Sequence, residues 1–173
     1  MKKLLIMVAG LLVAAALGAN TAPSDIVGPT AASGTINTVP GSQLADGETF
    51  TIGDGAGVTE TFEFDSNGSV TPGHQGVAFS AADSAFQTMG DVKNAVNASP
   101  LRIDASPGGY AAVSLLNQDV GSAGNVPITE TVTAQYFTVS GMSGGVNAPT
   151  AATLVRFSAD STRQGVELDW RTA

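Results

Sequence analysis

The chain has 173 residues, with 7 Lys and Arg against 15 Asp and Glu, a formal net charge of −8. Such an acidic chain repels nucleic acids and anionic lipids, so neither is an expected partner. It has no cysteine, which excludes disulfides and thiolate metal sites, and its 21 glycines with only 13% charged residues are typical of a β-rich extracellular protein.

The N-terminus has the pattern of an export signal. Lys2 and Lys3 precede an apolar run from Leu4 to Leu17, and small residues follow at Gly18 and Ala19. The run is shorter than the roughly 20 residues of a membrane-spanning helix, so we predict a cleavable signal peptide over 1–19. We expect an exported protein, extracellular or on the cell surface, with the periplasm as the alternative and no membrane contact after cleavage.

Residues 20–32 are rich in Pro, Ala, Ser and Thr without periodicity and predict a flexible mature N-terminus. Alternation of polar and apolar residues then predicts strands at Gly34–Val39, Glu48–Gly53, Val58–Asp65 and Val77–Ser80. The second and third of these place phenylalanines on one face each: Phe50, Phe62 and Phe64. The sequence GDGAG between them predicts a hairpin.

The spacing of apolar residues changes from that of a strand to that of a helix in TMGDVKNAVNAS, where Met89, Val92 and Val96 lie at i, i+3 and i+7. We predict a helix from about Thr88, its N-cap, to Ala98, packed on the phenylalanine face of the sheet. Four more strands are predicted: Leu101–Ser106, Tyr110–Leu116, Val126–Val132 and Tyr136–Gly141. The fold class expected for 33–145 is α+β, mainly antiparallel sheet with one packed helix.

The composition of 146–152 predicts a linker, and 153–173 predicts a C-terminal β-hairpin. A two-stranded piece cannot bury its own apolar face. We therefore expect its apolar residues to form an interaction surface: Leu154, Phe157, Val166, Leu168 and Trp170.

The segments GTIN, DGETFTIG, VTETFEF, DVKNAVNAS and GSAGNVPIT, in this order, resemble a module repeated in phage structural proteins and large bacterial surface proteins. It is also similar to the inserted module of flagellar filament and hook-associated proteins. The resemblance covers 33–145, departs between Asp65 and Gly76, and implies packing, display and contact without catalysis. The tail ATLVRFSADSTRQGVELDWRTA resembles the first two strands of a fibronectin-III-like or sorting-associated module, which implies a fragment of an Ig- or fibronectin-like domain.

The sequence contains few candidate catalytic or metal-binding residues. His74, the single histidine, lies in a glycine-rich predicted loop, and Glu63 alternates with Phe62 and Phe64 as a solvent-facing residue does. Neither pattern supplies the paired groups of a hydrolase, so we expect no enzyme and no cofactor. Three acidic residues beside Gly or Ser, Asp46, Asp54 and Asp65, are expected to cap turns, with a weak calcium site as the alternative.

The stretch GSAGN at 121–125 has the small residues of an anion-binding loop but no lysine, and a predicted strand follows it where a helix would be needed. We predict a tight turn in which Gly121 and Gly124 take backbone angles closed to other residues.

These features predict an exported, non-enzymatic structural or interaction module of a bacterial cell surface or extracellular assembly, assembled by β-strand addition to other subunits or to copies of itself. One alternative is a carbohydrate- or calcium-binding adhesive module that contacts surface glycans, with Tyr136 and Trp170 as stacking residues. The other is a fragment of a larger secreted protein.

Overall fold

The computed structural model describes residues 28–149, 154–162 and 165–172, the last two ranges by their backbone alone. The predicted signal peptide, 1–19, lies outside these residues. Within the described part, no helix is long and apolar enough to cross a membrane.

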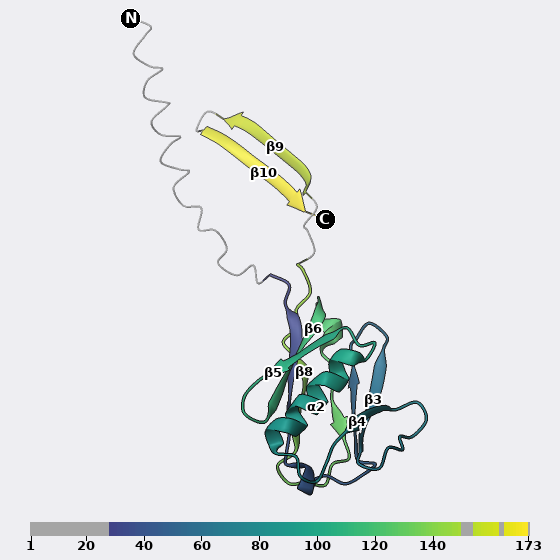
Figure 1. Ribbon diagram of the computed structural model, residues 1–173. Helices are drawn as coiled ribbons and strands as arrows, with labels where there is room; N and C mark the ends of the chain where they lie inside the picture. Colours follow the sequence, from purple (N-terminus) through teal and green to yellow (C-terminus); the bar gives the residue numbers. More distant parts are fainter. Residues whose placement is uncertain (1–27, 150–153, 163–164, 173) are drawn as a thin grey trace, which may run out of the picture.

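Two four-stranded sheets form the folded unit (Figure 1). The first has the order β5-β6-β1-β8, built from β1 (Ala31–Asn37), β5 (Ile103–Pro107), β6 (Ala112–Val120) and β8 (Thr138–Ser143), and is antiparallel throughout. The second has the order β4-β3-β2-β7, built from β2 (Thr49–Gly53), β3 (Thr59–Asp65), β4 (Gln75–Ala78) and β7 (Thr129–Glu130). With the α-helix, these sheets confirm the predicted α+β class.

Helix α2 (Ala85–Ala98) begins one turn earlier than predicted. Its N-cap is Ser84, whose Oγ accepts a hydrogen bond from the Gln87 N–H, while the Gln87 side chain accepts one from the Ser84 N–H. This capping box satisfies backbone donors at the start of the helix. Thr88, the predicted N-cap, is instead a buried residue inside the helix, so that assignment is wrong.

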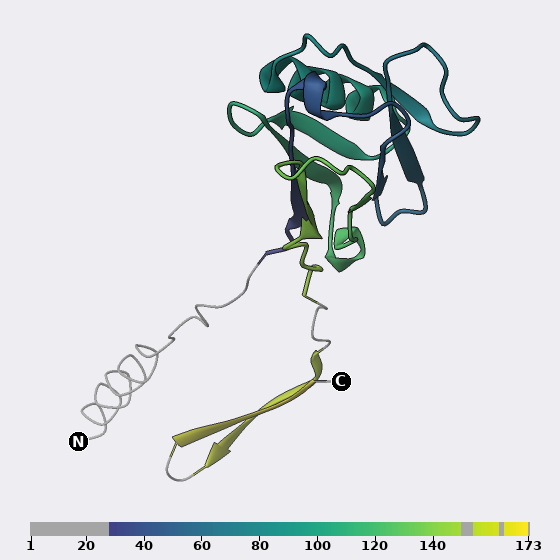
Figure 2. The ribbon, with the colours of Figure 1, turned by 90° about the horizontal axis from the view of Figure 1, so that it is seen from below.

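The core lies between the sheets and under α2 (Figures 1 and 2). The predicted helical stripe of Met89, Val92 and Val96 is buried, and α2 packs against β4 of one sheet and β5 and β6 of the other. Phe50 and Phe62 are opposite each other in the β2–β3 register and stack with ring centroids 4.8 Å apart. The aromatic face of the hairpin is thus buried, as predicted, but α2 has its main contacts with β4, β5 and β6 and not with the phenylalanine strands β2 and β3.

The observed strand bounds are shifted by up to four residues from the predicted ones, and two strands differ further in pairing or length. β4 covers 75–78 and runs parallel to β3, because the loop between them carries the chain back beside Phe62 before β4 begins. Of the strand predicted over Val126–Val132, only Thr129 and Glu130 pair, as β7. The Val126 carbonyl instead accepts from the Met142 N–H, which ties β8 of the first sheet to the segment leading into the second.

The folded unit extends beyond the predicted limits of 33 and 145. Thr30 and Val146 exchange two backbone hydrogen bonds of 3.0 Å, and the Thr30 hydroxyl donates to the Gly144 carbonyl. Part of the predicted flexible N-terminus and of the predicted linker is therefore fastened to the sheets. Beyond them, β9 (Leu154–Thr162) and β10 (Gly165–Thr172) form the predicted C-terminal hairpin.

Candidate functional site

The C-terminal hairpin places its apolar residues in register. Trp170 is opposite Phe157, Leu168 is opposite Ala159, and the irregularity at Arg171–Thr172 brings Leu154 opposite Thr172. Because directly opposite residues of an antiparallel pair share a face, and a strand alternates with period two, Val166 belongs to this face as well. We call this set the apolar register face: Leu154, Phe157, Val166, Leu168 and Trp170.

The other register face of the hairpin is polar, with Arg156 opposite Arg171, Ser158 opposite Asp169 and Asp160 opposite Glu167. Among the described strands, β9 and β10 pair only with each other. The hairpin therefore has two outer edges whose backbone groups are not taken up by another described strand, and one face of apolar sequence. Both features are those of a strand-adding interaction element.

The three calcium candidates do not form one site. Asp54 lies at the turn between β2 and β3, whereas Asp46 and Asp65 lie at the opposite end of that hairpin. Asp65 accepts from the N–H groups of Asn67, Gly68 and Ser69, and Asp46 accepts from Ser66. In the described ranges, no three acidic or histidine side chains are grouped to hold a metal ion. The observed contacts are those of the expected turn caps.

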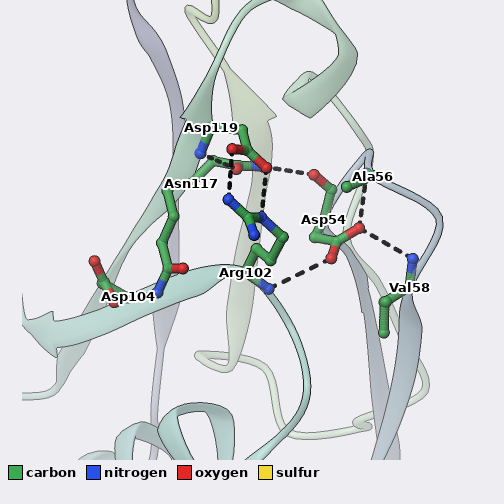
Figure 3. A network of polar contacts seen from close by, with 8 residues as sticks. Asp54, Ala56, Val58, Arg102, Asp104, Asn117 and Asp119 are labelled. Carbon is green, nitrogen blue, oxygen red and sulfur yellow. Dashed lines mark hydrogen bonds and ion pairs between the residues drawn. The ribbon is translucent and has the colours of Figure 1, made fainter.

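Asp54 lies at the centre of a polar cluster that connects the two sheets (Figure 3). We call this cluster, which consists of Asp54, Arg102, Asn117 and Asp119, the polar joint. One carboxylate oxygen accepts from the N–H groups of Ala56 and Val58, and the other from that of Arg102 at the start of β5. Burial by itself raises the pKa of this carboxyl group, but these hydrogen bonds outweigh it and hold the pKa below its usual value. The Asp54 carboxylate is thus a buried anion that is stabilised by hydrogen bonds from backbone N–H groups.

Asn117 completes the joint from β6. Its Nδ2 donates to the Asp54 carbonyl over 2.6 Å, and its Oδ1 accepts from the Asp119 N–H. On the solvent side, Arg102 and Asp119 form a two-bonded ion pair with N···O distances of 2.6 and 2.7 Å. These contacts connect the β2–β3 turn to the first sheet, so the joint is structural.

The GSAGN loop packs into the same region. Gly121 has φ +123° as predicted, but Gly124 has no positive φ. Gly124 is required for a different reason, because a Cβ there would lie 2.8 Å from Asn117 Nδ2. Asn125 exchanges hydrogen bonds with the backbone of Gly145, and Ser122 with the side chain of Asn147. The loop, which includes the short helix η2 (Ser122–Gly124), fastens the chain just before the hairpin.

The expected exposure of Glu63 is wrong. Glu63 is buried, and residues of the loop between β3 and β4 contact its carboxylate. Its carboxylate accepts from the Thr71 N–H, and its Oε2 lies 2.6 Å from His74 Nδ1. Hydrogen bonds from Thr71 and then from His74 outweigh burial and lower the pKa of Glu63. An ionised carboxylate only accepts, so Nδ1 is the donor and His74 holds the loop in place.

Glu48, directly before β2, is a second buried carboxylate that is held by hydrogen bonds from a loop. Burial raises its pKa, but hydrogen bonds from Ala45 and Thr133 outweigh this and lower it. Glu48, Asp54 and Glu63 are therefore three buried carboxylates that each fasten a loop through backbone donors. For Glu48 and Asp54, which flank β2, the position beside a turn is a usable signal, whereas Glu63 lies inside β3 and its alternation hides the role.

The Glu63–His74 contact leads to a pH-dependent prediction. Because the pKa of Glu63 is lowered on folding, its contribution to stability is present above the unfolded-state pKa of about 4.5 and is lost as pH falls through the folded-state pKa. We expect Glu63→Gln to have a lower Tm than the wild type at pH 7, with a difference that shrinks between about pH 5 and pH 3.

Thermal unfolding across this pH range measures that difference, and the other carboxylates are common to both proteins and cancel in it. Glu60→Gln, on the same strand, serves as the control. A Tm difference between Glu63→Gln and wild type that does not change with pH contradicts the prediction.

Comparison of the chain with models of protein families, with curated proteins and with solved structures gives no match. The resemblance to phage and surface modules stays a prediction.

Proposed function

We propose that this protein is an exported, non-enzymatic structural or interaction module of a bacterial cell surface or extracellular assembly, and that its subunits assemble by β-strand addition. The observation that carries the proposal is the C-terminal hairpin. It combines an apolar register face with two strands that pair with no other described strand.

A lone two-stranded ribbon is marginally stable in water, whereas three or more strands with a shared apolar face are stable. Pairing of hairpins from two subunits gives four strands whose apolar faces can be continuous. The main-chain hydrogen bonds then supply affinity, and the register of Phe157 and Trp170 supplies specificity.

The folded unit is protected against the same kind of pairing at β5. Asn97 of α2 donates to the Ala105 carbonyl and accepts from the Ala105 N–H, which occupies the outer edge of β5. Pro107 at the end of this strand has no N–H to offer. Such devices suppress unwanted edge-to-edge pairing, so the β5 edge of the first sheet is not available for assembly.

Truncation after Ala148 tests the proposal. We expect the full chain to form oligomers and the truncated chain to be monomeric with the same Tm for the sheet unit, because the described contacts that close this unit end at Asn147. Analytical ultracentrifugation measures the oligomers and circular dichroism the folding.

Two substitutions refine this test. Leu168→Ser alters the apolar register face, and Asp169→Ser alters the adjacent polar position as its matched control. Only Leu168→Ser should weaken assembly. A full chain that is monomeric at all concentrations, or a truncated chain that assembles as well as the full one, would refute strand addition.

A further inference from the structure

A shallow groove lies beside α2. It has a volume of about 460 Å³ and is open to solvent, between the chain after β4 and the outer side of the helix. Pockets that bind small molecules have volumes of roughly 300–1,000 Å³. The groove is separate from the hairpin and from the polar joint, so neither accounts for it.

One exposed aromatic ring lines the groove, and a second lies next to that ring, outside the lining. Phe86, from the first turn of α2, lines it with 54% of its surface exposed. Tyr110, from the turn before β6, is 75% exposed, and the two ring centroids are 6.1 Å apart at an interplanar angle of 33°. The two rings form a shared apolar surface that the described residues leave uncovered. A flat aromatic face of this kind stacks well on the C–H face of a sugar ring.

Polar groups without described partners lie further along the helix. No hydrogen bond from the described residues reaches the side chains of Asp91 or Asn94, both of which line the groove. Burial, followed by the charge of Asp83, raises the pKa of Asp91, as expected for a carboxyl group that lacks donors. Together a carboxylate and an amide can both accept from and donate to neighbouring hydroxyl groups.

Gly90 lies between Phe86 and Asn94 on the groove side of α2, and no contact among the described residues requires a glycine there. Glycine is the poorest helix former after proline, and a Cβ at this position would meet nothing within 4 Å. Phe86, Gly90 and Asn94 follow one another at i, i+4 spacing along the groove side of α2. The missing side chain leaves room for a ligand to approach the helix backbone between the aromatic and the polar end.

We propose that this groove binds a neutral saccharide. One pyranose ring stacks on Phe86 and Tyr110, and its hydroxyl groups, or those of the next ring, bond to Asp91 and Asn94. The carboxylates of Asp83 and Asp91 repel phosphates, nucleic acids and uronic acids, which restricts the ligand to uncharged sugars. Because the groove is open to solvent, a chain of sugars can continue beyond it.

Titration of the full chain with cellohexaose and with chitohexaose, followed by amide chemical shifts, tests the assignment. We expect saturable binding of at least one of them with shifts along α2 and at Tyr110, and no binding of oligogalacturonate. Phe86→Ala should weaken binding about tenfold, and Leu116→Ala, which truncates an exposed apolar side chain outside the groove, should leave it unchanged.

Gly90→Ala separates binding from folding. It should raise Tm through the higher helix propensity of alanine and yet weaken saccharide binding, because the new methyl group occupies the groove. Wild-type affinity in either Phe86→Ala or Gly90→Ala overturns the assignment. Absence of saturable binding of both neutral oligosaccharides at about 10 mM overturns it as well.

Discussion

Phe62→Ala should lower the free energy of unfolding by about 3–5 kcal/mol, because the substitution removes a large buried ring and leaves a cavity. Phe62 has no exposed surface, and it stacks on Phe50 with the planes 10° apart. Phe50 in turn contacts Phe64 and Phe137, with centroids 5.8 and 6.4 Å away. Loss of one ring therefore loosens the aromatic cluster that joins β2, β3 and the segment before β8.

Urea unfolding followed by fluorescence measures this loss. Phe86→Ala makes the same chemical change at an exposed ring and should alter the unfolding midpoint little. If Phe62→Ala does not fold, Phe62→Leu gives a smaller loss of the same sign. A midpoint for Phe62→Ala that equals that of Phe86→Ala would contradict the central position of this ring in the core.

Asn117→Ala should lower the free energy of unfolding by about 2–3 kcal/mol, because it leaves the buried Asp54 carbonyl without its donor. The matched control is Asp119→Asn two residues later, which breaks the Arg102 ion pair. Both members of that pair are about half exposed, so the control should have a smaller effect that disappears at high salt.

Chemical denaturation at low and high salt distinguishes the two variants. The loss in Asn117→Ala should persist at high salt, since it comes from a buried hydrogen bond. If Asp119→Asn proves the more damaging substitution, the ion pair and not the buried amide is the main stabiliser of the joint.

Much of the fold could be predicted from periodicity. Alternation identified β2 and β3 with their phenylalanine faces, and the i, i+3, i+7 stripe identified α2, because burial of one face is written directly into such spacing. The start of α2 could also have been found, since Ser84 followed by Gln87 three residues later is a capping-box signature. Thr88, followed three residues later by Asp91, has a similar local pattern but lies inside the helix.

Other features depend on contacts between distant residues. Glu63 alternates like a surface residue, yet the Ser66–His74 loop covers it and supplies its hydrogen-bond donors. Val126 belongs to a strand-like run, yet its carbonyl bonds to Met142 across the sheets. No local pattern encodes these pairings, because the donors come from elements far along the chain or from a loop whose path is not periodic.

The sequence by itself determined the fold class, the faces of the central hairpin and the C-terminal ribbon, because side-chain periodicity decides which surface must be buried. Only the tertiary structure decided that Glu48, Asp54 and Glu63 are buried loop fasteners, and that Phe86, Asp91, Asn94 and Gly90 line one groove. A buried carboxylate is stable only where hydrogen-bond donors converge on it, and a groove exists only where separate elements meet. Both conditions arise in three dimensions.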